Sequence, residues 1–283
     1  MTVIEAIQQG SARLENAGVE SPRLNAELLV GDVLRIHRLS LVLDSRRELT
    51  TEQFLALEEH LRRREAREPV QHILGTAEFY GREFRVNRHV LVPRPETELL
   101  AEWTLQTLAA SSVEAPCLLD FGTGSGCLAI TLALEQSTAS VHAVDISAEA
   151  LAVAKVNASA LKAPVTFHLG DGFAALPGGL QFDGIVSNPP YIPSREIAGL
   201  DPEVRDHDPL LALDGGAEGL EFYRRLATEA PAWLKPGGWL ALEFGDGQAA
   251  DLLRIFGGAP WRGAEVRKDD TGRERMLRIF VAG

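Results

Sequence analysis

The stretch Cys117-Leu118-Leu119-Asp120-Phe121-Gly122-Thr123-Gly124-Ser125-Gly126 decides the fold of this chain. An apolar run over 117–121 leads directly into alternating glycines, and a second apolar stretch over 127–136 follows them. Glycine lets the backbone turn tightly and lets a ligand approach it closely. The stretch therefore predicts a strand, a glycine loop and a helix in immediate succession.

The chain on both sides of this loop alternates between strand-like and helix-like segments. Further strands are expected over 140–145, 165–169, 182–187 and 239–244, and two more over 261–267 and 276–281. Such alternation favours a parallel sheet with helices on both faces. Only a short polar turn joins the last two strands, so they must pair as an antiparallel hairpin. We predict an α/β fold with a doubly wound, mostly parallel, seven-stranded sheet.

The residues before the sheet indicate two further parts. Apolar residues over 1–75 recur at helical spacing, which predicts a small helical domain. Its charged run over 58–68 is interpreted as the solvated face of a helix. Residues 76–92 are rich in β-formers around a Gly-Arg pair, which predicts a β-hairpin linker to the sheet domain at 93–283. Phe79 and Phe84 in this linker either pack in a core or line a site that faces the sheet domain.

Composition excludes several classes of protein. The 283 residues carry a net charge of −12, and an acidic chain is a poor binder of nucleic-acid backbones. No apolar run approaches the roughly 18–20 residues of a membrane span, and the first ten residues do not resemble a signal peptide. With only two cysteines, the chain has neither a disulfide framework nor a zinc cluster. We expect a cytoplasmic monomer that binds neither membrane nor nucleic acid.

Asp145 indicates what the glycine loop binds. It stands 19 residues beyond Gly126, at the end of the second predicted strand. In this layout an acidic side chain accepts hydrogen bonds from ribose hydroxyls, so a cofactor with an adenosine group is expected. The loop reads G-x-G-x-G, not the G-x-G-x-x-G of dinucleotide sites, and no phosphate-binding G-x-x-x-x-G-K-[ST] occurs.

Asn188-Pro189-Pro190-Tyr191 follows the fourth predicted strand. Each proline fixes its own φ, lacks an N–H and restricts the residue before it, so the loop is stiff and rich in acceptors. Fixed acceptors suit a substrate NH2 group on a planar carbon, because two N–H donations orient the nitrogen and expose its lone pair. Tyr191 can pack against that planar group. An activated electrophile such as a sulfonium methyl then needs no strong base.

Together these features resemble the class I S-adenosylmethionine-dependent methyltransferases. More closely, the chain is similar to the release-factor glutamine methyltransferases, which methylate N5 of the glutamine in the Gly-Gly-Gln motif of class-1 peptide chain release factors. The resemblance covers the whole chain and includes Pro93-Arg94-Pro95-Glu96-Thr97-Glu98 and the segment Val204–Leu220. Two alternatives share the chemistry: methylation of a ribosomal-protein glutamine, and N6-methylation of adenine in nucleic acid.

The resemblance assigns roles by position. Gly122, Thr123, Gly124, Ser125 and Gly126 are expected to wrap the methionine and ribose of S-adenosyl-L-methionine, which leaves as S-adenosyl-L-homocysteine. Asp145 is expected to hold the ribose, and Asp171, Gly172 and Phe173 to lie beside the adenine, with Asn188 near the methyl group. Asn188, Pro189, Pro190 and Tyr191 form the expected catalytic and substrate-binding loop, helped by Phe79 and Phe84.

Three positions depart from the family pattern. Gly172 stands where an aromatic residue is common, Phe121 where leucine is commoner, and Asp208 where glutamate is more usual. The stretch 93–98 has two interpretations: a plain helix start, with Pro95 at the first position and acidic residues in the first turn, or a functional segment.

Other groups carry weaker signals. The histidines show no metal-ligand spacing, so no metal is expected, and Asp206-His207-Asp208 is interpreted as a turn. The loop over 192–218 is long for a compact domain and is predicted to cover the substrate channel. Cys127 is interpreted as a packed residue.

Overall fold

The computed structural model describes all residues, 1–283, as two compact units. The first unit consists of Met1–Thr76 together with Leu200–His207. The second consists of Ala77–Gly199 and Asp208–Gly283. The chain therefore leaves the second unit after Gly199 and returns to it at Asp208.

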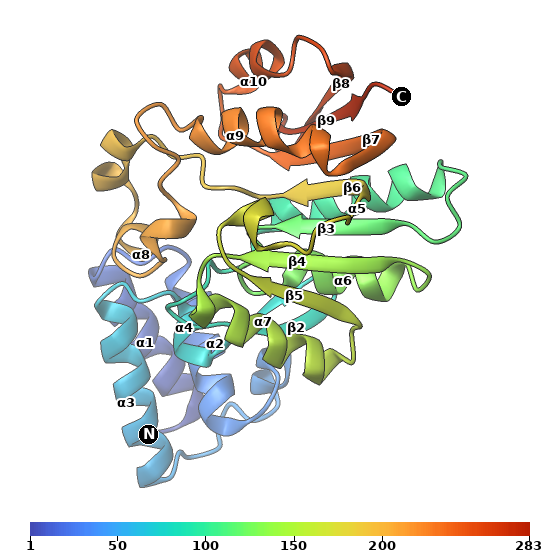
Figure 1. Ribbon diagram of the computed structural model, residues 1–283. Coiled ribbons are helices and arrows are strands. Elements are labelled where there is room, and N and C mark those ends of the chain that lie inside the picture. The colour runs from blue at the N-terminus through green and yellow to red at the C-terminus, as the bar shows by residue number, and fades with distance from the viewer. The chain divides into compact units, whose positions relative to one another are not determined.

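The first unit is helical, as predicted (Figure 1). Its elements are α1 (Val3–Asn16), α2 (Pro22–Leu34), η1 (Arg38–Val42), α3 (Thr51–Glu65), α4 (Val70–Leu74) and, from the later segment, α8 (Pro202–Arg205). The hydroxyls of Thr2 and Thr50 cap α1 and α3 in reciprocal capping boxes. Leu14, Leu29 and Leu57 have almost no exposed surface and form the centre of the core.

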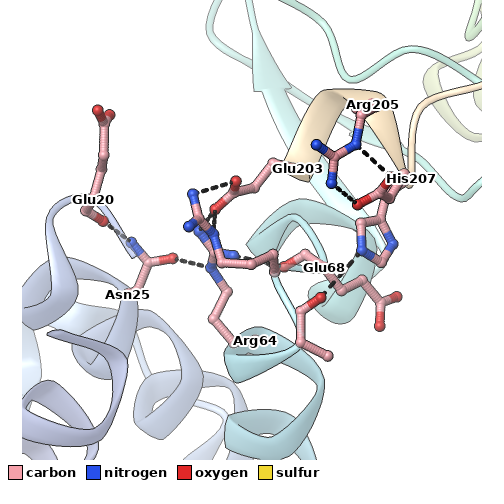
Figure 2. Close-up of polar contacts among 10 residues, drawn as sticks. Glu20, Asn25, Arg64, Glu68, Glu203, Arg205 and His207 are labelled. Carbon is pink, nitrogen blue, oxygen red and sulfur yellow. Dashed lines mark hydrogen bonds and ion pairs between the residues drawn. The ribbon is translucent and has the colours of Figure 1, made fainter. Parts of the chain in front are cut away.

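An ion-pair cluster ties α8 to this helical unit (Figure 2). Glu203 Oε1 accepts hydrogen bonds from Arg64 Nη2 and Arg67 Nε, both at 2.7 Å, and Oε2 accepts from Arg67 Nη2 at 2.6 Å. Arg64 is only 5% exposed, and its Nε donates to Asn25 Oδ1 at 2.9 Å. The prediction that the run 58–68 is solvated is therefore wrong for Arg64, because its charge is neutralised inside the protein.

The second unit contains the predicted seven-stranded sheet, in the order β5-β4-β3-β6-β7-β9-β8. Its strands are β3 (Cys117–Phe121), β4 (Ser140–Asp145), β5 (Val165–Leu169), β6 (Phe182–Ser187), β7 (Leu234–Glu243), β8 (Trp261–Lys268) and β9 (Glu274–Val281). Neighbouring strands from β5 to β7 pair in parallel, whereas β9 is antiparallel to both β7 and β8. The last strand of the chain thus inserts between the two before it.

Helices cover both faces of this sheet (Figure 1). One core contains α5 (Pro95–Ala109) and α6 (Cys127–Glu135), with α7 (Ala148–Leu161) beside them. The opposite core contains α9 (Glu221–Glu229) and α10 (Ala249–Ile255). Successive residues of β3 alternate between the cores, with Leu118 in the first and Leu119 in the second, as a strand buried on both faces requires. Short 3-10 turns are η2 (Gly172–Ala175), η3 (Ser194–Gly199), η4 (Leu210–Ala212) and η5 (Ala230–Ala232).

The predicted hairpin is also present, as β1 (Thr76–Phe79) and β2 (Arg82–Arg85). Tyr80 and Gly81 both have positive φ, as a two-residue hairpin turn of the primed type requires. Phe79 and Phe84 are 0% exposed and pack edge to face, with ring centroids 6.0 Å apart. Rings without exposed surface cannot contact a substrate, so in this structure the core interpretation of both residues holds and the substrate-binding one does not.

None of the helices combines the length and the apolar character that crossing a membrane requires.

Candidate active site

A cavity of about 270 Å³ lies at the carboxyl ends of β3, β4 and β6. Ligands of open parallel sheets bind at this edge, where strand order reverses. The glycine loop, Asp145, Gly172 and Asn188 all contribute to its wall. Residues predicted from four separate stretches of sequence therefore meet at one site.

The glycines of the loop serve two purposes. Gly122 and Gly124 have φ of +77° and +55°, and a Cβ on either would meet nothing within 4 Å. Gly126 also has positive φ, but its Cβ would lie 3.1 Å from the Cβ of Ala154 in α7. The first two glycines leave open space on the cavity side, whereas the third allows close packing of helix against loop.

Asp145 is held at the rim by backbone groups. Its Oδ2 accepts from Gly124 N at 2.8 Å, and its Oδ1 accepts from Ser147 N at 2.9 Å. Each carboxylate oxygen can accept two hydrogen bonds, so each retains an acceptor site. A fixed carboxylate with two remaining acceptor sites can receive a pair of neighbouring hydroxyls.

The segment 171–173 divides between cavity and core. Asp171 and Gly172 line the cavity, and Phe121 at the end of β3 lines it as well. A Cβ on Gly172 would lie 2.6 Å from Phe121 Cζ, so the ring of Phe121 occupies the space that a side chain at 172 would need. Phe173 is 3% exposed and stacks on Trp233 at 5.6 Å. The Phe173 ring therefore packs in the core, and the contact of this segment with the cofactor stays a prediction.

The Asn-Pro-Pro-Tyr loop presents only part of itself to the cavity. Asn188 and Pro190 line it, but Pro189 is buried and Tyr191 lies outside the wall. Gln248 Nε2 donates to the Tyr191 carbonyl at 2.9 Å and ties the end of the loop. Burial raises the pKa of Tyr191 to about 12, so its phenol is neutral.

Asp120 is a cavity residue that the sequence interpretation did not single out. It is 1% exposed, and its Oδ2 accepts from Thr123 Oγ1 at 2.6 Å and from Ala129 N at 3.1 Å. Its Oδ1 is buried with no hydrogen-bond partner, and burial raises the pKa of Asp120 to about 7. The position of Asp120 in the sequence could have indicated this role, because it stands near the carboxyl end of β3, directly before Phe121 and the glycine loop.

Thr97 and Glu243 are two further residues that the sequence interpretation missed. Asn188 Nδ2 donates to Thr97 Oγ1 at 3.0 Å, and Thr97 Oγ1 donates to Glu243 Oε2 at 2.7 Å. Thr97 lies in the first turn of α5, which begins at Pro95 as predicted, and Glu243 is the last residue of β7. Both are almost completely buried, at 3% and 2% exposed.

The long loop after the Asn-Pro-Pro-Tyr motif also reaches the cavity. Pro209, Leu211 and Ala212 line it, and a backbone bridge between Ile192 and Asp214 closes the base of the loop. Asp208, where the family more often has glutamate, pairs with Arg94 Nη2 at 3.0 Å. The interpretation of Cys127 as a packed residue is confirmed, because it is 9% exposed and belongs to the core that contains α5 and α6. This burial raises the pKa of its thiol to about 12.

Family models match two stretches of this chain. Residues 5–75 match the PrmC N-terminal domain, and residues 97–199 match the methyltransferase small domain.

Solved structures share the fold of the sheet unit. A methyltransferase from Pyrococcus furiosus is 21% identical, with a TM-score of 0.53, over 72% of this chain and 91% of that chain. A 16S rRNA N2 G1207 methyltransferase from T. thermophilus, solved with AdoMet and guanosine, has a TM-score of 0.51 at 21% identity, over 74% of this chain and 50% of that chain. At these identities the likeness concerns the fold alone.

Relatives along the whole chain are closer. The release factor glutamine methyltransferase of Rhodospirillum rubrum is 45% identical over 276 residues, which are 96% of this chain and 82% of the relative. That of Deinococcus radiodurans is 43% identical over 283 residues, which are the whole of both chains. At this identity and coverage, the chain belongs to the release factor glutamine methyltransferase family.

Proposed function

We propose that this protein transfers a methyl group from S-adenosyl-L-methionine to N5 of the glutamine in the Gly-Gly-Gln motif of class-1 peptide chain release factors. The observation that carries the proposal is the meeting of Asn188 with the glycine loop and Asp145 around one cavity, in a chain of this family. An amide acceptor then faces the place where a methyl donor is bound.

The residues of the cavity fit S-adenosyl-L-methionine. Gly122 and Gly124 leave room for close approach, and Asp145 retains acceptor sites for two ribose hydroxyls. The orphaned Oδ1 of Asp120 suits a cationic or N–H-bearing ligand. When bound, S-adenosyl-L-methionine supplies an electrophilic methyl group on a sulfonium ion.

The chain's own contribution to the reaction is orientation. Asn188 Oδ1 accepts one N–H of the substrate amide and turns the nitrogen lone pair toward the methyl group. A carbonyl of the rigid Asn-Pro-Pro-Tyr loop accepts the second N–H. Fixed acceptors would also stabilise the positive charge that develops on nitrogen as the N–C bond forms and the S–C bond of the sulfonium breaks, after which the nitrogen gives one proton to water.

Methyl transfer from labelled S-adenosyl-L-methionine to purified release factor tests this function, with peptide mass spectrometry to locate the label. Ribosomal proteins and double-stranded DNA serve as parallel substrates. We expect label on the Gly-Gly-Gln glutamine, loss of most transfer in Asn188→Ala, and nearly unchanged cofactor binding. Asn16→Ala, at an exposed position of α1, is the matched control. Label confined to DNA adenine, or to a ribosomal protein, would refute the release-factor assignment.

The helical unit is proposed to help hold the protein substrate. It exposes large apolar side chains close together in sequence, with Leu39, Val42 and Leu43 at 67%, 77% and 88% exposed. Replacing Val42 and Leu43 together by serine should raise KM for intact release factor and leave the affinity for S-adenosyl-L-methionine unchanged. Deletion of residues 1–75 is a poorer test, because it also removes the partners of Glu203 in α8.

A further inference from the structure

An asparagine amide has two faces of opposite character, and only one of them can serve the proposed reaction. The Oδ1 side accepts hydrogen bonds, whereas the Nδ2 side donates them and would repel a substrate NH2 group. The two orientations differ by a rotation of the amide, so something must select between them.

We propose that Thr97 and Glu243 are positioning residues that hold the Asn188 amide with Oδ1 toward the cavity. The inference rests on the proposed function, in which Oδ1 accepts from the substrate amide. It assigns a role to the stretch 93–98, which the helix start alone does not explain.

The direction of the hydrogen bonds follows from the chemistry of the three groups. An ionised Glu243 can only accept, so the single hydroxyl proton of Thr97 must point to it. Thr97 Oγ1 then has only lone pairs for Asn188, so Asn188 must present Nδ2 to it. Neither protein backbone nor side chain donates to Asn188 Oδ1, which is left for a ligand.

Burial makes this selection strong. Thr97 and Glu243 are 3% and 2% exposed, so water does not compete for their hydrogen bonds. In such surroundings an unsatisfied polar group is costly, and a reversed amide would leave two acceptors, Asn188 Oδ1 and Thr97 Oγ1, facing each other. The orientation of Asn188 is therefore preorganised before substrate arrives.

Protonation of Glu243 removes the selection. A neutral carboxyl can donate to Thr97, whose hydroxyl proton is then free to donate to Asn188 Oδ1, and the chain can run in reverse. Burial raises the pKa of Glu243 to about 7, with Glu96 also raising it and the Thr97 hydroxyl, Arg275 and the Asn188 amide opposing. Tyr191, Tyr223 and Cys127 also interact electrostatically with Glu243, and burial raises the pKa of each and keeps it neutral.

Substitution at Thr97 separates positioning from packing. Thr97→Val keeps the shape and removes the hydroxyl, whereas Thr97→Ser keeps the hydroxyl and loses a methyl group. We expect kcat to fall about 10- to 100-fold in Thr97→Val, with KM for release factor and the affinity for S-adenosyl-L-methionine within about two-fold of wild type. Thr97→Ser should recover most of kcat. Equal kcat values in the valine and wild-type proteins, or no recovery with serine, would overturn the role of Thr97.

The pH profile tests Glu243. Wild-type kcat should fall as pH drops through about 7, because the competent orientation needs the carboxylate. In Glu243→Gln this acid limb should disappear and kcat should be low throughout. An acid limb that persists unchanged in Glu243→Gln would overturn the role of Glu243.

A readout without catalysis keeps this inference distinct from the proposed function. The side-chain amide signal of Asn188 in a ¹⁵N NMR spectrum, assigned by its loss in Asn188→Ala, should shift with pH around 7 in wild type. It should not shift in Glu243→Gln or Thr97→Val. If the Asn188 signal does not change with pH in wild type, the orientation of Asn188 does not depend on the protonation of Glu243, and the inference is refuted. If the signal changes with pH but release factor is not methylated, only the proposed substrate is refuted.

Discussion

Glu203 is partly buried and Glu243 is almost completely buried, yet the protein shifts the pKa values of the two carboxylates in opposite directions. Burial raises the pKa of both. At Glu203, in the helical unit, the hydrogen bonds of Arg67 and Arg64 outweigh burial and hold the pKa at about 2. At Glu243, in the sheet unit, the hydroxyl of Thr97 is the main opposing group, and the pKa rises to about 7.

The difference in pKa gives the two carboxylates different roles: Glu203 forms a structural ion pair, whereas Glu243 can change its protonation state near neutral pH. With a pKa of about 2, Glu203 is ionised at neutral and mildly acidic pH, so its bonds to Arg64 and Arg67 hold α8 in the helical unit over that range. Glu243 can exist in two protonation states near neutrality, and its neighbours Thr97 and Asn188 respond to which one is present. A guanidinium partner therefore keeps Glu203 ionised, whereas a hydroxyl partner leaves Glu243 able to gain or lose a proton near neutral pH.

The largest effect on stability is expected from Glu203→Gln. Loss of this anion leaves the Arg64 guanidinium, 5% exposed, without its charged partner. Breaking a buried pair from one side costs about 3–5 kcal/mol in the free energy of unfolding. Because the pKa is depressed from 4.5 to about 2, the contribution of Glu203 is complete above pH 4.5 and disappears as pH falls through about 2.

Urea denaturation at pH 7 and pH 3 measures this effect, and the two proteins should differ less at the lower pH. Glu59→Gln is the matched control, since Glu59 also pairs with an arginine of α3 but is exposed, so no change is expected. Equal losses in the two variants would mean that burial of Arg64 does not govern the energy of the pair.

Glu243→Gln should act in the opposite direction on stability. The folded pKa of about 7 lies above the ordinary 4.5, so the folded state binds more protons and stability decreases as pH rises from 4.5 to 7. Removing the buried charge should raise the free energy of unfolding at pH 8 by up to about 3 kcal/mol. Near pH 4.5 the variant and wild type should converge. A variant that is less stable than wild type at pH 8 would show that ionised Glu243 is held by interactions stronger than its burial penalty.

Asp145 extends the comparison to a carboxylate whose oxygens are bound by backbone N–H groups, with neither arginine nor threonine as partner. Asp145→Ala should weaken binding of S-adenosyl-L-methionine by about 1–3 kcal/mol through lost ribose hydrogen bonds. Calorimetric titration measures this, and Asp44→Ala, at a half-buried position of the helical unit outside the cavity, serves as the control. Unchanged affinity in Asp145→Ala would remove the ribose assignment.

Local patterns predicted the frame of the site well. The strands β3, β4, β5 and β6 begin and end at the predicted residues, because each is an apolar run bounded by a turn or a glycine. The glycine loop, Asp145 and Asn188 reach one cavity because the carboxyl ends of parallel strands share one edge. These consequences follow from short-range sequence and sheet topology together.

Apart from Asp120, whose partners Thr123 and Ala129 are close in sequence, the misses depend on distant partners. Arg64 and Glu203 are 139 residues apart, and Thr97 and Glu243 are 146 apart, so no spacing reveals either pair. Whether Phe84 or Phe173 faces a cavity or a core is likewise decided by tertiary packing. A sequence pattern indicates which residues are apolar or ionisable. Their partners in the folded structure decide which ionisable residues form structural ion pairs and which change protonation state near neutral pH.

The smallest effect is expected at Asp171, which lines the cavity but has a 63% exposed side chain paired with Arg225. This pair faces solvent, so Asp171→Asn should leave the free energy of unfolding unchanged. Affinity for S-adenosyl-L-methionine should fall less than about three-fold, since Arg225 already occupies the carboxylate that the cofactor would need. Calorimetry beside Asp145→Ala decides the matter, because a loss as large at 171 as at 145 would show that Asp171 exchanges Arg225 for the cofactor. Asp171 would then belong with Asp145 among the carboxylates that bind the cofactor. It would not belong with Glu203, whose ion pairs with arginine only stabilise the fold.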